Sequence, residues 1–175
     1  AEALADAATE SDQRALGRAQ DEIARDSLAH YVLHDASPAA LDLLRRLALT
    51  HDDFDAATAA ALAPAGEAQA FAVLDAALAS GTLRIDDARY RFRHELVRQA
   101  LVDQVPPHRR LKLHRELAAR LSELDVPPAL VARHWLAAGS VREAMPWLLA
   151  AARDALRLAA FSDALRHVDP VLAHD

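Results

Sequence analysis

The chain contains no cysteine among its 175 residues, and this absence narrows the chemistry open to it. Disulfide frameworks and metal sites built on thiolates are excluded. Glycine is also scarce, with 4 residues, so a glycine-rich phosphate-binding loop has little material from which to form. No apolar run approaches the length of a membrane span, and no charged-then-apolar leader opens the sequence. We therefore expect a cytoplasmic protein without a membrane partner, and a piece cut from a longer protein.

The apolar residues that are present favour helices. Hydrophobic residues make up 53% of the chain but aromatic residues only 5%, so alanine and leucine dominate. Both are strong helix formers and weak strand formers. A mostly α fold is expected, in one ordinary domain or two small ones.

Charge is distributed unevenly along the chain. Residues 1–82 carry 5 basic and 14 acidic side chains, residues 83–120 carry 10 and 5, and residues 121–175 carry 5 and 7. A basic stretch of net +5 therefore lies between blocks of net -9 and -2. Such a stretch suits either a polyanion or the acidic parts of the same protein.

Helical periodicity covers the first part of the chain. A helix is expected over 13–34, and Ser37 and Pro38 begin the next one as cap and first-turn residue. The buried stripe of that second helix is expected to consist of Leu41, Leu44, Leu47 and Ala48.

Two further helices are expected before residue 81. One is short and alanine-rich, over 55–63, and the other spans 67–80 and ends at Gly81 in a left-handed cap. The apolar side of the 67–80 helix is expected to comprise Phe71, Leu74, Ala77 and Leu78.

The stretch "RYRFRHELVRQAL", residues 89–101, joins an alternating pattern to a helical one. Residues 83–85 and 89–93 flank an acidic turn and predict a β-hairpin. Tyr90 and Phe92 are expected beneath the hairpin against the 67–80 helix, with the alternating arginines pointing outward. Three short helices followed by a hairpin are typical of a winged helix.

Further helices are expected over 94–105, 108–124, 129–138 and 141–159, and a last one from about residue 161. In the 108–124 helix the inward side is expected to hold Leu111, His114, Ala118 and Leu121. Ala144 and Ala164 occupy equivalent small positions, as in degenerate tetratricopeptide-like repeats. The predicted organisation is an N-terminal helical arm (1–36), a winged-helix domain (37–105) and a helical-repeat region (106–175).

No catalytic constellation is evident. The sequence has no nucleophile elbow and no glycine-rich lysine loop, and its acidic pairs lie in turns, where they cap backbone amides. His30 and His34 have the spacing of metal ligands on a helix, but two ligands do not make a site, so we interpret them as a helix face. We expect no enzyme activity, no catalytic residue, no metal and no cofactor.

DNA reading is disfavoured despite the winged-helix pattern. The 67–80 helix would enter the major groove, yet it carries no Arg or Lys and has two acids, Glu67 and Asp75. The basic stretch includes residues expected on the outer face of the 108–124 helix, namely Arg109, Arg110, Lys112 and Arg115. We expect no direct DNA binding by this chain.

His94 and Glu95 lie where the predicted strand enters a helix. Histidine donates to phosphates, and a carboxylate at a helix start can cap it and orient the imidazole. The alternative interpretation is that Glu95 is an ordinary first-turn acid and that His94 packs beneath the hairpin. The residues themselves leave both interpretations open.

The order of these parts resembles the middle of STAND-class signalling ATPases, and in particular the bacterial regulators related to the maltose-regulon activator. The resemblance runs over about residues 25–175, from "DSLAHYVLHDASPAALDLLRRLAL" through "FRHEL" to "ARHWLAAGSVREAMPWLLAAARDAL". In many of these proteins the helix after the wing begins Met-His-Asp, and its histidine contacts bound ADP. Here His94 and Glu95 take the His and Asp positions, and Arg93 stands in place of the Met.

The resemblance implies a regulatory role. The chain would couple the nucleotide state of an absent ATPase core to a protein or small-molecule inducer bound by the repeats, with His94 and Glu95 as nucleotide-sensing residues. Its partners would be that core and the other domains of the full-length protein. The alternatives are a free-standing helical-repeat scaffold for protein–protein interaction and, third, a DNA-binding winged-helix regulator.

Overall fold

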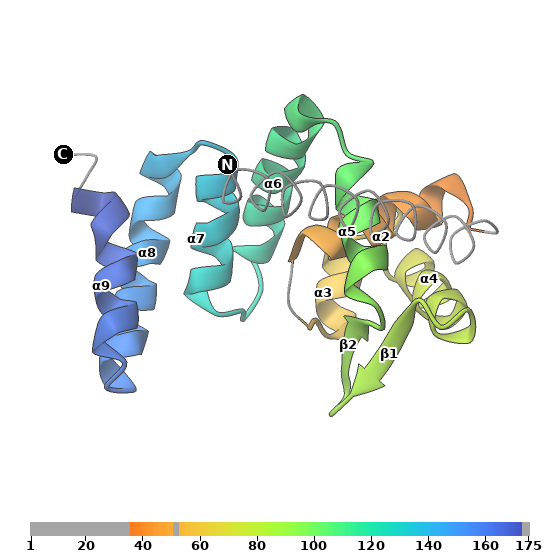
Figure 1. The fold of residues 1–175 in the computed structure, drawn as a ribbon, viewed down its shortest axis with the longest axis horizontal. Helices are drawn as coiled ribbons and strands as arrows, with labels where there is room; N and C mark the ends of the chain where they lie inside the picture. The colour runs from red at the N-terminus through yellow and green to blue at the C-terminus, as the bar shows by residue number, and fades with distance from the viewer. Residues whose placement is uncertain (1–35, 51–52, 173–175) are drawn as a thin grey trace, which may run out of the picture.

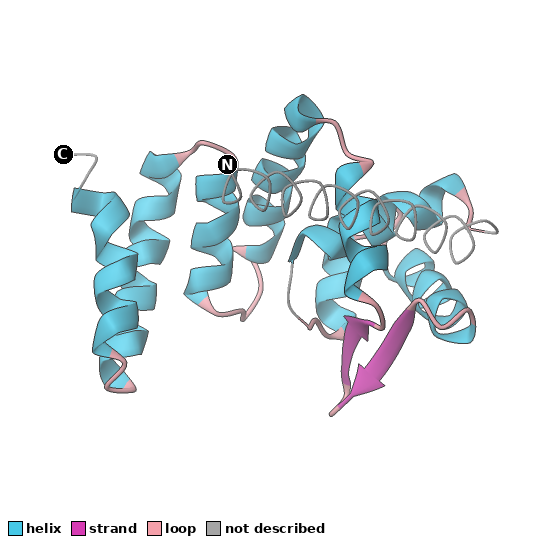
Figure 2. Cartoon of the chain, in the orientation of Figure 1, coloured by secondary structure: helices cyan, strands magenta, loops and turns pink. Residues whose placement is uncertain are grey.

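A computed structural model describes residues 36–50 and 53–172 and shows a mostly helical chain with one small hairpin (Figures 1 and 2). The helical arm over 1–36, with its helix over 13–34 and the pair His30 and His34, lies outside the described residues except for Ala36. In chain order the elements are α2 (Pro38–Thr50), α3 (Ala56–Leu62), α4 (Glu67–Ala79), β1 (Leu83–Asp86), β2 (Arg89–Phe92), α5 (Glu95–Asp103), α6 (Pro107–Leu121), α7 (Pro128–Ala137), α8 (Val141–Arg157) and α9 (Phe161–Leu172).

Local capping signals set several of these boundaries. The Ser37 hydroxyl accepts a hydrogen bond from the amide of Ala40 at 3.2 Å, as its position before Pro38 predicts. Gly81 follows α4 with φ of 73°, in the left-handed region that glycine adopts without penalty. Both caps confirm the boundaries expected from the sequence.

The hairpin pairs β1 with β2 in antiparallel register, with Leu83 opposite Phe92 and Asp86 opposite Arg89. Its two-residue turn places Asp87 and Ala88 at φ of 48° and 62°, which matches the right-handed twist of the strands. A third backbone segment joins its edge: the amide of Phe54 donates to the carbonyl of Tyr90 at 2.9 Å, and the amide of Tyr90 donates back at 2.7 Å.

The first core lies among α2, α3, α4, α5 and the hairpin, with α2 in contact with all three of the other helices. Its largest fully buried side chains include Leu43, Leu47, Phe54, Leu74, Leu83 and Leu101. The stripe expected on α2 is correct for Leu44, Leu47 and Ala48, which are buried, and Leu41 is half-buried. Of the apolar side expected on α4, Leu74 and Ala77 are buried and Leu78 is half-buried, whereas Phe71 is 43% exposed.

The last four helices, α6 to α9, stand side by side in a row that leads away from the hairpin (Figure 1). Each packs against the next, and the small residues Ala144 and Ala164 are buried at these contacts, as expected. Leu117, Leu121 and Val131 extend the first core into α6 and α7. Leu111 was expected to face inward, but the structure leaves it 49% exposed.

The aromatic side chains of the hairpin are only partly buried. Tyr90 and Phe92 both pack against the first core and both are of intermediate exposure, whereas Phe54, beneath the hairpin, is 2% exposed. The rings of Phe54 and Tyr90 stack with centroids 5.9 Å apart. Phe54 therefore takes the anchoring position that the alternation in β2 suggested for Phe92.

None of the helices in the described part of the chain has the length and apolar content needed to cross a lipid bilayer.

Candidate functional site

His94 occupies the N-cap position of α5, directly after the hairpin. Its backbone is extended, with φ of -125° and ψ of 125°, and its side chain makes no capping hydrogen bond. The imidazole is exposed, so His94 does not pack beneath the hairpin as a core residue. His94 is therefore accessible at the start of α5.

Glu95, the second residue of the expected pair, is held by the chain itself. Its two carboxylate oxygens accept from Nε of Arg98 at 3.0 and 2.8 Å, and Nη2 of Arg98 also donates to this carboxylate. The Glu95 side chain is 69% exposed, whereas that of Arg98 is 6% exposed. The carboxylate thus meets solvent on one side and a buried cation on the other.

Arg98 carries the contact inward from α5 to α2. Its Nη1 donates to the backbone carbonyl of Ala48 at 2.8 Å. Ala48 lies in the last turn of α2, where carbonyl oxygens have no partner within the helix and carry the negative end of its dipole. A buried guanidinium satisfies such an oxygen and is stabilised by it.

Two more arginines, from elements far along the sequence, bind carbonyls at or shortly after the end of α2. Nη2 of Arg133, on α7, donates to the carbonyl of Thr50. Nη2 of Arg89, on β2, donates to the carbonyl of Asp53 at 2.9 Å, and its Nε lies 3.0 Å from the Asp53 carboxylate. We call the backbone carbonyls of Ala48, Thr50 and Asp53 the α2 junction.

The α2 junction therefore links three separate elements, the hairpin, α5 and α7, through arginine side chains. Each guanidinium has a fixed planar set of donors, so a shift of one element changes the geometry at the carbonyl that its arginine binds. The three carbonyls lie close together in the sequence. Sequence reasoning missed Arg98 and Arg133, because helical spacing does not distinguish a buried arginine from a solvated one. The only signal was the interruption of the apolar face of α5 by Arg98.

Asp55 continues this region at the start of α3. Its carboxylate accepts from the amide of Thr58 at 2.7 Å and caps the helix, and Nη1 of Arg89 lies 3.9 Å away. Partial burial raises the pKa of Asp55, but the hydrogen bonds from Thr58 and the charge of Arg89 outweigh it, so the pKa lies below its ordinary value. The ionised form is therefore the one that the fold stabilises.

A histidine pair lies between α6 and α7. The Nδ1 atoms of His114 and His134 are 2.9 Å apart, and the ring of His134 is fully buried. At this distance one nitrogen donates a proton and the other accepts it. Among the described residues no cluster of three or more His, Cys, Asp or Glu side chains could hold a metal ion.

The basic residues expected on the outer face of α6 differ in their surroundings. Arg109, Lys112 and Arg115 are exposed, but Arg110 is half-buried and its Nη2 donates to the carbonyls of Val102 and Val105 at 3.0 and 3.1 Å. Arg110 thus fixes the loop between α5 and α6 rather than forming part of an outward stripe.

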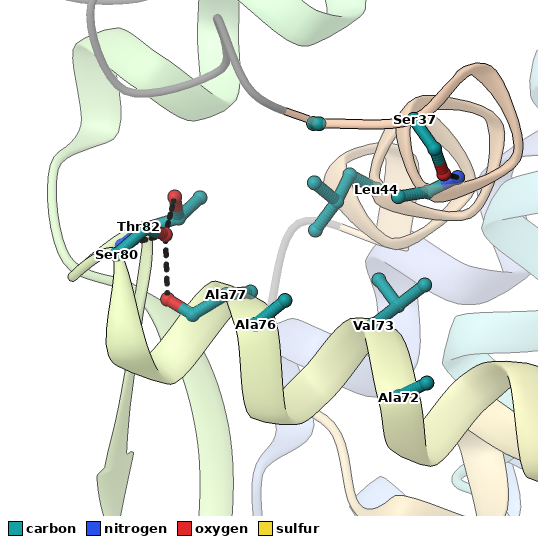
Figure 3. A pocket seen from close by; sticks show the side chains of 10 residues that line it. Ser37, Leu44, Ala72, Val73, Ala76, Ala77, Ser80 and Thr82 are labelled. Carbon is teal, nitrogen blue, oxygen red and sulfur yellow. Dashed lines mark hydrogen bonds between the residues drawn. The ribbon is translucent and has the colours of Figure 1, made fainter.

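An apolar groove of about 340 Å³ lies between α2 and α4 (Figure 3). Leu44 and Val73 face it, together with several alanines. Its hydroxyl groups serve the fold, because Ser37 caps α2 and the hydroxyls of Ser80 and Thr82 lie 2.8 Å apart in a mutual hydrogen bond. The groove could hold an apolar group, but its lining contains no side chain suited to acid–base or nucleophilic chemistry.

Comparison of the chain with known protein families, with curated proteins and with solved structures gives no match.

Proposed function

We propose that this chain is the regulatory middle of a bacterial signalling ATPase, a winged helix followed by helical repeats. It would transmit the nucleotide state of a core outside this chain to the repeats, where an inducer or partner binds. In this proposal the chain itself performs no chemistry. His94 meets the nucleotide, the α2 junction passes the signal, and α6 to α9 receive it.

The element order supports the winged-helix part of the proposal. Helices α2, α3 and α4 precede the hairpin, and Phe54, between α2 and α3, adds a short third segment to its edge. The succession of α6 to α9, each against the next with buried alanines at the contacts, supports the repeat part.

The surroundings of His94 support its role as a contact to nucleotide. An exposed imidazole lies at a helix start, where the positive end of the helix dipole favours an anion. Its neighbour Glu95 binds Arg98, which is in turn bound to α2. If the start of α5 moved on loss of a phosphate contact, the hydrogen bond between Arg98 and the Ala48 carbonyl would therefore change.

The observation that carries the proposal is the shared end of α2. The Arg98 contact at Ala48 and the Arg133 contact at Thr50 lie two residues apart on one helix end, yet they come from α5 and α7. The last residues of α2 thus connect α5, which begins beside His94, to α7 through two separate arginine contacts joined by the helix backbone.

The test is made on the longer protein. The coding sequence upstream of Ala1 is expected to contain a phosphate-binding loop with its lysine. In that protein His94→Ala should weaken ADP retention by about 10- to 150-fold, the equivalent of one charge-assisted hydrogen bond. Arg115→Ala, at an exposed cation of α6, is the matched control and should leave retention unchanged. An upstream sequence without such a loop would contradict the proposal.

A scaffold for protein–protein interaction is the second candidate, favoured by the apolar surface around the α8–α9 turn. Leu156, Leu158, Phe161 and Leu165 are 53%, 81%, 64% and 66% exposed. Large apolar side chains exposed close together in the sequence, around one turn, are a feature that contact surfaces use. Retention of partner binding by the 175-residue chain without any ATPase core would favour this candidate. DNA reading has no such support, since α4 carries Glu67 and Asp75 and no basic residue.

A further inference from the structure

A cavity of about 610 Å³ lies where the hairpin side of the molecule meets the row of helices. Its lining comes from the segment before α3, from β2 and from α7, α8 and α9. This volume is in the range of sites that enclose small organic molecules, and such sites occur preferentially where two structural units meet. The cavity is separate from His94, which does not line it.

Two kinds of side chain line this cavity. One part is apolar and is formed by Leu130, Ala132, Leu136 and Leu148 of α7 and α8, with Pro127 and Pro170 beside them. The other part is basic and is formed by Arg89, Arg133, Arg166 and His167. The apolar part suits a hydrocarbon or aromatic body, and the basic part suits an anionic group.

The lining itself holds more basic than acidic side chains, although Arg89 and Arg166 each have an acid partner. Asp53 is the one carboxylate of the lining and is already bound to Arg89, with Asp55 also 3.9 Å from that guanidinium. Arg166 pairs with Asp163, which lies in the preceding turn of α9 and outside the lining. Three arginines thus face the cavity against one carboxylate.

We propose that this cavity binds a small organic anion, a carboxylate or phosphate joined to an apolar body. The anionic group would take donors of Arg166 and His167, and the body would lie against Leu130, Leu136 and Leu148. A guanidinium offers five donors, so the contact of Arg166 with Asp163 leaves others for a ligand. A cationic ligand would find only the Asp53 carboxylate in the lining, and that group is already bound to Arg89.

The position of the cavity connects it to the α2 junction. Arg89 and Arg133 line the cavity and also hold the carbonyls of Asp53 and Thr50. The charge of an anion bound in the cavity would therefore act on the two guanidinium groups that hold those carbonyls. The binding of an anion does not depend on the proposed function. The idea that this anion is the inducer does rest on the proposed function, and it names the chemical class of that inducer.

The experiment titrates the 175-residue chain with benzoate and with phenyl phosphate, and uses benzyl alcohol and benzylamine as uncharged and cationic controls of similar shape. Binding is followed by calorimetry and by amide shifts in nitrogen-15 NMR spectra. We expect saturable binding of at least one anion, with shifts on α7 and α9, and no binding of either control. Tighter binding of benzoate would identify carboxylate as the preferred anionic group, and tighter binding of phenyl phosphate would identify phosphate.

Arg166→Gln and Arg157→Gln form a matched pair of variants. Both arginines are on the surface, 74% and 77% exposed, and both pair with an aspartate three residues earlier, but only Arg166 lines the cavity. Arg166→Gln should weaken anion binding about tenfold or more, with an unchanged melting temperature, and Arg157→Gln should not. Absence of saturable binding by both anions, or equal losses in the two variants, would overturn the inference. Neither result bears on ADP retention through His94, so the two proposals fail separately.

Discussion

The guanidinium of Arg98 lies 2.8 Å from the backbone carbonyl oxygen of Ala48, and this contact joins the helix after the hairpin to the end of α2. Arg98 is 5% exposed although its side chain carries a charge. Its burial is tolerated because Glu95 supplies a carboxylate and Ala48 a carbonyl. A charge held in this way makes the position sensitive to substitution.

Replacement of Arg98 should destabilise the chain strongly. Arg98→Met keeps most of the aliphatic stem but leaves the buried Ala48 carbonyl without this donor, and we expect a loss of about 2–4 kcal/mol in the free energy of unfolding. Arg115→Met, at an exposed position of the neighbouring α6, should change it by less than about 0.5 kcal/mol. Urea titrations monitored by circular dichroism make the comparison. Similar small losses in both variants would show that Arg98 is solvated.

The two phenylalanines at the hairpin should differ in their contribution to stability. Phe54→Ala removes a ring that is 2% exposed and should cost about 3–5 kcal/mol. Phe92→Ala removes a half-buried ring, and we expect a loss of about 1–3 kcal/mol, since less apolar surface is returned to water. Denaturant titration of both variants checks the order. A larger loss for Phe92 would mean that the alternation in β2, and not the Phe54 bridge, sets the anchor.

Asp55 should make stability depend on pH in the acid range. Its pKa is lowered in the folded state, so the ionised carboxylate stabilises the fold above about pH 4, and this contribution is lost as the pH falls through the lowered pKa. Asp55→Ala should cost about 0.5–2 kcal/mol at pH 7, as for other N-caps, and progressively less below pH 4. Asp75→Ala, on the exposed face of α4, serves as the control. A cost for Asp55→Ala that stays constant down to pH 2 would contradict the assignment.

The pair His114 and His134 should share a single proton between their Nδ1 atoms. Because these atoms lie 2.9 Å apart, two Nδ1 protons would collide, and none would leave two lone pairs facing each other. Long-range proton–nitrogen NMR at neutral pH should therefore find one ring protonated at Nδ1 and the other not. Two rings in the same tautomer would show that the contact is absent in solution.

The succession of helices and the hairpin followed from local signals. Ser37, Gly81 and the acidic turn each act within a few residues, and their effects are readable without knowledge of the fold. Burial was harder to predict, as Phe71 and Leu111 illustrate. Both belong to apolar stripes at helical spacing, but alanine-rich helices offer more than one apolar face, and only packing partners decide which one is covered.

The α2 junction illustrates a different limit of sequence reasoning. Arg98 contacts Ala48 and Arg133 contacts Thr50 across 50 and 83 residues of sequence. Arg98 differs from the exposed Arg115 only in that it interrupts the apolar face of its helix, and the sequence around Arg133 gives no such signal. The pair His94 and Glu95 was located from the strand-to-helix switch alone, whereas the partner of Glu95 on α5 became evident only with the burial of Arg98.

The proposed relay from α5 to α7 is tested most directly by a double-mutant cycle between Glu95 and Arg133, which lie at its two ends. Unfolding free energies are measured for the 175-residue chain, for Glu95→Ala, for Arg133→Ala and for the double variant. If Arg98 and the α2 junction connect them, the two effects are non-additive by about 0.5–3 kcal/mol, while a cycle between Glu95 and the distant Arg157 is additive. Additivity within about 0.3 kcal/mol for Glu95 and Arg133 would contradict the relay.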